Sequence, residues 1–148
     1  SDPNGDVILR RLPSLPEERI TDQQFRHLKP HDETFTGLDT FPAPPRVTTV
    51  RMVSDEVTAL CPITGQPDWY EVTIAYRPDG LCVESKSLKL YFQQFRNTGI
   101  FGEAFAEQIA QDIMAACAPR WVRTTVVQKP RGGITITASA KIAKETPA

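Results

Sequence analysis

The sequence predicts an α+β fold in which an antiparallel four-stranded sheet carries two helices on one face. Four segments are rich in β-branched or alternating apolar residues, as strands are, and two segments repeat apolar residues at helical spacing. Their order along the chain is strand, strand, helix, helix, strand, strand. This order is typical of an α+β layer with both helices on the same side of the sheet.

The first two strands are expected after residue 45. The run RVTTVRMV begins at Arg46, and the run WYEVTIAYR places an apolar residue at every second position from Tyr70 to Tyr76. A Pro-Asp-Gly turn signal at residues 78–80 follows the second strand.

Two helices are expected in the middle of the chain, and two strands after them. A helix over about 85–96 is predicted by apolar residues three and four apart, namely Leu88, Tyr91, Phe92 and Phe95. A second helix, from Glu103 until Pro119 stops it, is predicted by Phe105, Ile109, Ile113 and Cys117. The β-branched runs WVRTTVVQ and ITITASAKI then predict two strands, joined by the turn KPRGG.

The chain is expected to hold one domain, over residues 46–148, preceded by an irregular arm, residues 1–45. Its 148 residues allow one modest core. The arm contains seven prolines and few periodic apolar positions, with one short helical turn expected near Gln23 to Leu28. Because a four-stranded sheet leaves its outer strands unpaired, we expect a homo-oligomer.

Composition disfavours several classes of function. Lys and Arg number 17 against 18 Asp and Glu, so no net basic charge favours direct binding of nucleic acid. No apolar run suggests a membrane span or a signal peptide, so we expect a cytoplasmic protein. The three cysteines have no metal-ligand spacing and only His27 and His31 could add imidazole ligands, so no metal is expected.

The segment LCPITGQPDW is the first candidate for chemistry. It places Cys61 in a loop rich in Pro and Gly, with Asp68 seven residues on. A cysteine nucleophile must be accessible and needs a group that takes its proton, which Asp68 could be. Alternatively, Cys61 is a small buried residue and Asp68 bonds its own turn. Cys82 and Cys117 are expected in the core.

Two further segments could bind anions. ESKSLKLY places Lys86 and Lys89 on one side of a helix start, where they could contact phosphate groups, although such a pair also suits a solvated face. Arg131 to Gly133 could hold an anion with backbone amides and a guanidinium, but a hairpin turn explains the glycines equally well.

Together, LCPITGQPDW, ESKSLKLY, FRNTGIFGE and RGGI, in this order, resemble the single-module 7-cyano-7-deazaguanine reductases, the nitrile reductases called QueF. The resemblance covers about residues 45–142. It implies the tunnelling fold, in which sheets of several subunits close a barrel and active sites form between subunits. It also implies reduction of the nitrile of 7-cyano-7-deazaguanine to a primary amine with two NADPH, on the route to queuosine in tRNA.

The resemblance assigns roles to residues of this chain. Cys61 would add to the nitrile as a covalent thioimide, and Asp68 would act as general acid and base. The residues implied for the deazapurine are Glu84, Ser85, Phe101 and Glu103. The residues implied for NADPH are Lys86, Ser87, Lys89, Arg131 and Gly132.

One position departs from the family. Many members have a histidine before the glutamate, where this chain has Gly102 before Glu103. The glycine opens space that a water could fill. Two alternatives stay open: a nonreducing relative that transfers an amine or amidine to the same nitrile, and a noncatalytic oligomer that binds purines or pterins.

Overall fold

The structure is a computed structural model that describes residues 34–144 of the chain. Its elements in chain order are β1 (Thr40–Pro42), β2 (Val50–Leu60), β3 (Pro67–Arg77), β4 (Leu81–Val83), α3 (Ser85–Gln94), the 3-10 helix η1 (Phe95–Asn97), α4 (Gly102–Cys117), β5 (Trp121–Arg131) and β6 (Ile134–Ala143). None of the helices within 34–144 is long and apolar enough to cross a membrane.

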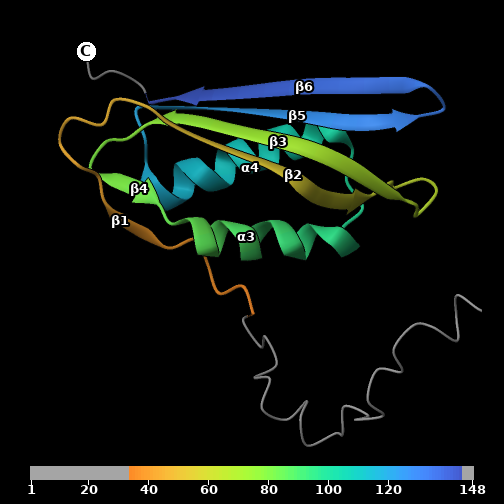
Figure 1. Cartoon of the computed structure of the whole chain (residues 1–148), viewed down its shortest axis with the longest axis horizontal. Helices are drawn as coiled ribbons and strands as arrows, with labels where there is room; N and C mark the ends of the chain where they lie inside the picture. Colours follow the sequence, from red (N-terminus) through yellow and green to blue (C-terminus); the bar gives the residue numbers. More distant parts are fainter. Residues whose placement is uncertain (1–33, 145–148) are drawn as a thin grey trace, which may run out of the picture. The chain divides into compact units, whose positions relative to one another are not determined.

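The predicted fold class is confirmed. Strands β2, β3, β5 and β6 form one antiparallel sheet in the order β2-β3-β5-β6, and α3 and α4 lie on the same face of it (Figure 1). Both predicted helices are present, the first ending in the 3-10 turn η1. The structure adds a small sheet that the sequence did not predict, in which β1 pairs with β4.

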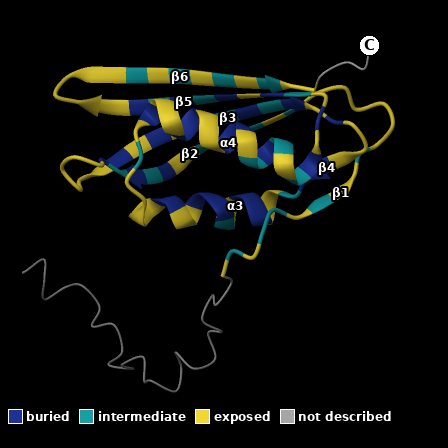
Figure 2. Cartoon of the chain, turned by 180° about the vertical axis from the view of Figure 1, so that it is seen from behind, coloured by how far each residue is buried: buried dark blue, intermediate teal, exposed yellow. Residues whose placement is uncertain are grey.

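The core lies between the sheet and the helices. Along β3, the side chains of Tyr70, Val72, Ile74 and Tyr76 all point into it and are buried. Phe105, on the inner face of α4, packs edge-on against Tyr70, with ring centroids 5.2 Å apart. Figure 2 shows the same division, since the helix faces toward the sheet are buried while β6 is exposed or half-buried along its length.

Two bulges set the direction of the side chains at one end of the sheet. In β2, Ser54 pairs with Val72 and Val57 with Tyr70, so one extra residue is inserted. In β5, Gln128 pairs with Ile136 and Arg131 with Ile134, which is the same irregularity. A bulge reverses the alternation of side chains, so residues three apart share one face.

The bulge in β5 also corrects one prediction. The turn KPRGG was expected to end the strand at Gln128, but β5 continues to Arg131. The bulge accommodates Pro130 within the strand, since a residue that cannot donate to the ladder is tolerated at such an irregularity. The turn is therefore only Gly132 and Gly133, whose φ angles of 61° and 79° are those that glycine adopts readily.

Part of the expected N-terminal arm lies within the described residues. Phe35 packs on Tyr91, with ring centroids 5.7 Å apart, and the backbone N–H of Asp39 donates to the Ser87 hydroxyl at 2.9 Å. The division of the chain at residue 45 stays a prediction. The helical turn expected near Gln23 to Leu28, and both histidines, lie outside the described residues.

Candidate active site

Cys61 directly follows β2, at the start of a tight loop that returns the chain into β3. The backbone N–H of Cys61 donates to the Gln66 carbonyl at 2.8 Å, and that of Gly65 donates to the Cys61 carbonyl at 2.9 Å. Gly65 has a φ of 69°, which suits glycine at this corner. The thiol is thus held at a fixed point at the end of the sheet, with 4% of the residue exposed.

The surroundings of Cys61 favour its thiolate. Hydrogen bonds from the hydroxyl and the backbone of Thr64, and then from the Arg131 guanidinium and the backbone of Ile63, lower the pKa of Cys61 to about 6, although burial acts in the opposite direction. Cys117 shows the contrasting case, since burial raises its pKa to about 11. Cys61 is therefore buried, but its environment is that of a nucleophile.

Asp68 lies on the same face of the sheet as Cys61. Asp68 is a buried residue of β3 and pairs with Ala59 of β2. Ala59 is two residues before Cys61, so the side chains of Ala59, Cys61 and Asp68 point to the same face of the sheet. Its carboxylate contacts the guanidinium of Arg131, a residue outside its own turn.

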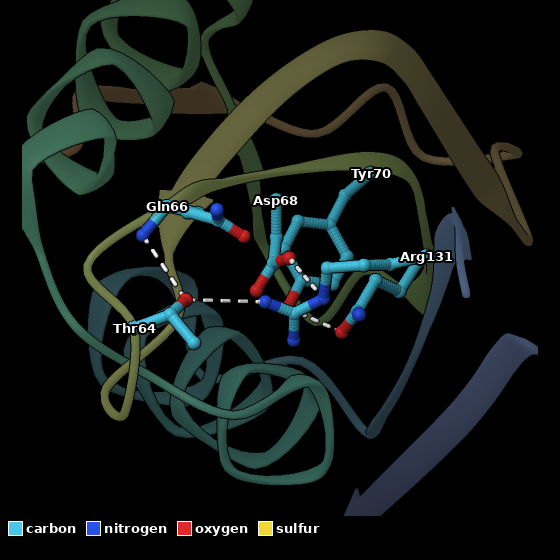
Figure 3. Close-up of polar contacts among 6 residues, drawn as sticks. Thr64, Gln66, Asp68, Tyr70 and Arg131 are labelled. Atoms are coloured by element: carbon cyan, nitrogen blue, oxygen red, sulfur yellow. Dashed lines mark hydrogen bonds and ion pairs between the residues drawn. The ribbon is translucent and has the colours of Figure 1, made fainter.

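Arg131 joins the loop to the opposite hairpin. Its Nε lies 3.5 Å from Asp68 Oδ1, and its Nη1 donates to Thr64 Oγ1 at 3.4 Å (Figure 3). These contacts depend on the bulge in β5, because without it the side chain of Arg131 would point to the other face of the sheet. Sequence reasoning assigned Arg131 to the cofactor and missed Thr64, since neither bulge nor cross-strand contact can be read from spacing.

The start of α4 is brought to the same place. Leu60 donates its N–H to Thr98 at 2.9 Å and accepts one from Ile100 at 3.0 Å, so the segment before α4 runs beside the end of β2. Phe101 is the N-cap residue of α4 and is 52% exposed, and Glu103 lies in the first turn. Both residues are exposed to solvent.

Tyr70 lies at the centre of these charged groups. Burial raises its pKa to about 12, the negative charges of Asp68 and Glu103 add to the rise, and Arg131 opposes it. The phenol therefore stays protonated at neutral pH, and its hydroxyl donates to Gln128 Oε1 at 3.1 Å. Neither residue was recognised as functional from the sequence, because Tyr70 reads as a core residue of a strand.

Two polar side chains lie beside Gly102. A Cβ placed on Gly102 would lie 3.5 Å from the Tyr70 ring and 3.6 Å from both the Tyr70 hydroxyl and Gln128 Oε1. These are ordinary contact distances, so Tyr70 and Gln128 form a polar wall next to the backbone of Gly102. The interpretation that a water fills space at this position stays a prediction.

The other predicted residues lie at the start of α3, which is at the opposite end of the sheet from the β2–β3 loop (Figure 1). The Glu84 carboxylate caps the helix, accepting from the N–H of Lys86 at 2.6 Å and of Ser87 at 2.7 Å, and these bonds lower its pKa. The Ser87 hydroxyl is buried and donates to the Glu84 carbonyl at 2.9 Å. These contacts leave Ser85 as the exposed hydroxyl of the group.

A groove of about 380 Å³ runs between α3 and β2. Its polar and charged lining includes Ser85, Lys89 and Arg96 from the helical side and Thr58 from β2. Thr58 is three residues before Cys61, which an extended chain spans in about 10 Å. The groove thus extends from Ser85, at the start of α3, to Thr58, near the end of β2.

The comparisons with known proteins agree on one family. A family model described as QueF-like protein matches residues 67–147. The chain is 47% identical over 109 residues to the NADPH-dependent 7-cyano-7-deazaguanine reductase of Syntrophus aciditrophicus, covering 72% of this chain and 78% of the relative. It is 44% identical over 116 residues to the protein of the same name from Frankia casuarinae, covering 78% of this chain and 93% of the relative.

A solved structure supports the same relationship. The apo form of the archaeosine synthase QueF-Like superposes with a TM-score of 0.62 at 25% identity, covering 68% of this chain and 98% of that chain. The arrangement of sheet and helices is therefore shared with that structure.

Proposed function

Since the chain belongs to the QueF-like protein family, we propose that it is an NADPH-dependent 7-cyano-7-deazaguanine reductase that forms 7-aminomethyl-7-deazaguanine for queuosine biosynthesis, a tRNA modification. The observation that carries this proposal is Cys61, whose pKa is lowered to about 6 by Thr64 and Arg131 beside the buried Asp68. We place the enzyme in the cytoplasm, where NADPH is available.

The nitrile is activated by covalent addition. Asp68 takes the proton of the Cys61 thiol, and the thiolate attacks the nitrile carbon. A C–S bond forms, one π bond of the nitrile breaks, and Asp68 returns the proton to the nitrogen to give a thioimide. When bound, two NADPH molecules in turn would each supply a hydride to this carbon, and Asp68 would pass the accompanying protons to the nitrogen. Between the two reductions the C–S bond breaks and the sulfur leaves as the thiolate, which the contacts to Thr64 and Arg131 stabilise.

Arg131 supports this chemistry in two ways. Its guanidinium stabilises the thiolate before addition and after release, and its 3.5 Å contact holds the Asp68 carboxylate near the loop. The predicted contact of Arg131 and Gly132 with the cofactor stays untested. The turn geometry already requires Gly132 to be a glycine, and the contacts of Arg131 support a role at the thiol.

The residues of the groove fit a dinucleotide phosphate. Its volume of about 380 Å³ lies within the range of ligand sites, roughly 300–1,000 Å³. Lys89 of α3 and Arg96 of η1 place two positive charges on the helical side of the groove, against one carboxylate, Glu56, on the side of β2, which suits the phosphates of NADPH. We propose that Lys86 contributes from the same helix start, whereas the Ser87 hydroxyl is already bonded inside the protein.

The complete site requires more than one subunit in this proposal. Glu84 and Ser85 lie at the start of α3, at the end of the sheet opposite the β2–β3 loop (Figure 1). In this proposal, neither residue contacts the substrate that is bound to Cys61 of its own chain. A neighbouring subunit can supply them if the chains assemble through open sheet edges, as in the tunnelling fold, with Phe101 and Glu103 binding the deazapurine.

The alternatives are less well supported. The relatives at 43–48% identity are named as NADPH-dependent reductases, and the segment ESKSLKLY is complete, which disfavours a nonreducing transferase. A noncatalytic binding protein has no use for a stabilised thiolate beside a carboxylate.

The proposal is tested by following covalent addition. Incubation with 7-cyano-7-deazaguanine is expected to add the mass of the substrate to the wild-type chain, and subsequent NADPH is expected to discharge it. Cys61→Ala should form no adduct and oxidise no NADPH, whereas Cys82→Ala, which removes another buried thiol, should behave like the wild type. An adduct or full turnover in Cys61→Ala would refute the covalent mechanism.

A further inference from the structure

A buried polar pair lies against Gly102, at the position where the chain has no side chain next to Glu103. The Tyr70 hydroxyl donates to Gln128 Oε1 at 3.1 Å, and both polar atoms lie 3.6 Å from where a Cβ of Gly102 would stand. The pair comes from neighbouring strands, because Tyr70 of β3 and Gln128 of β5 are directly opposite each other. It therefore belongs to the rigid part of the fold.

The pair also belongs to the candidate active site. The charges of Asp68, Glu103 and Arg131 all act on the Tyr70 hydroxyl. Asp68 is two residues from Tyr70 on β3, so its side chain lies on the same face of the sheet. The pair therefore lies among the charged groups of the candidate site.

The two residues differ in what they can reach. Gln128 is 5% exposed, which equals Asp68 at 5% and is close to Cys61 at 4%, whereas Tyr70 is fully buried at 0%. Gln128 is thus as accessible to a ligand as the two catalytic residues, and Tyr70 can act only through it. Because Gln128 Oε1 accepts from the phenol, the amino group of its carboxamide is the part left for a ligand.

On the basis of the proposed function, we propose that Gln128 contacts the nitrogen of the reacting nitrile group and that Tyr70 is the positioning residue that orients it. The amide N–H of Gln128 can donate to the lone pair of a nitrile or imine nitrogen, and it has no such acceptor in a protonated amine. The contact thus favours the intermediate over the product. The pair supplies the polar wall that a glycine at position 102 cannot supply.

The consequence concerns the imine that follows release from Cys61. An imine that is not held reacts with water, which gives an aldehyde and ammonia. Loss of this contact therefore converts part of the once-reduced substrate to aldehyde, at the cost of one NADPH instead of two. The amount of aldehyde therefore reports on positioning, and a general loss of stability would not change it.

The test compares two tyrosines of one strand. Tyr70→Phe removes the hydroxyl that orients Gln128, and Gln128→Leu removes the donor. Tyr76→Phe is the matched control, since Tyr76 is equally buried in β3 and its hydroxyl also has a partner, the backbone N–H of Val83 at 2.8 Å. In each variant, thioimide formation is followed by intact mass, and aldehyde, amine and NADPH oxidised per nitrile are measured together.

We expect Tyr70→Phe and Gln128→Leu to form the thioimide, to release about tenfold more aldehyde than the wild type, as loss of one hydrogen bond predicts, and to oxidise fewer than two NADPH per nitrile. Tyr76→Phe should keep the wild-type ratio. Unchanged product ratios in both site variants would overturn this inference alone. Absence of a thioimide in the wild type would overturn the proposed function and this inference with it.

Discussion

The acidity of Cys61 can be tested by changing one hydroxyl. Thr64 makes the largest contribution to the lowered pKa of Cys61, which stands at about 6 against an ordinary value of 9.0. Thr64→Val keeps the shape of an exposed side chain and removes its hydrogen bond to sulfur. Since several bonds share the lowering, loss of the largest should raise the pKa of the thiol by about one unit.

The assay is alkylation of Cys61 by iodoacetamide as a function of pH, read by mass spectrometry of the labelled peptide. At about pH 7, lowering the pKa from 9.0 to about 6 raises the fraction of Cys61 present as thiolate roughly 90-fold. A thiolate of lower pKa is also a weaker nucleophile, by roughly 20-fold here, so the alkylation rate rises only about fourfold. The midpoint of the pH profile is therefore the informative quantity.

We expect a midpoint near 6 in the wild type and about one unit higher in Thr64→Val. Thr73→Val, a similar change in the middle of β3, serves as the control and should leave the midpoint unchanged. A wild-type midpoint near 8 or 9, or no change in Thr64→Val, would refute the argument that the loop stabilises the thiolate.

Other predictions concern the remaining groups of the site and core. Arg131→Met should raise the pKa of Cys61, so activity, which is present above the thiol pKa and lost as pH falls through it, should be lost at higher pH than in the wild type. Asp68→Asn should lower kcat at least about 100-fold, and a rate like the wild type would remove its acid/base role. The lowered pKa of Glu84 contributes stability above its ordinary value of 4.5, so the difference in Tm between wild type and Glu84→Gln should shrink as pH falls below that value. Phe105→Ala should lower the free energy of unfolding by about 3–5 kcal/mol in chemical denaturation, and a cost below about 1 kcal/mol would contradict its place in the core.

The fold was largely predictable because its signals are periodic. The alternation from Tyr70 to Tyr76 and the helical spacing from Phe105 to Cys117 each mark a buried face, and both were confirmed. Strands β1 and β4 were missed because three residues are too short to show a period. The bulges were missed because they depend on pairing between strands, which spacing along one strand does not reveal.

The site was predictable in its motifs and not in its contacts. Cys61 and Asp68 were identified from one loop, but the proximity of Arg131 depends on the bulge in β5. The importance of Gln128 depends on Tyr70, which pairs with it across two strands far apart in sequence. Such cross-strand groups become visible only when the register of the sheet is known.

The central claim is that this chain reduces a nitrile to an amine through Cys61. Its most direct test is the amount of NADPH oxidised per 7-cyano-7-deazaguanine consumed by the purified protein, with the product identified in the same sample. We expect two NADPH per nitrile and 7-aminomethyl-7-deazaguanine as the product. Consumption of the nitrile without NADPH oxidation, or bound nitrile that is never consumed, would contradict the claim.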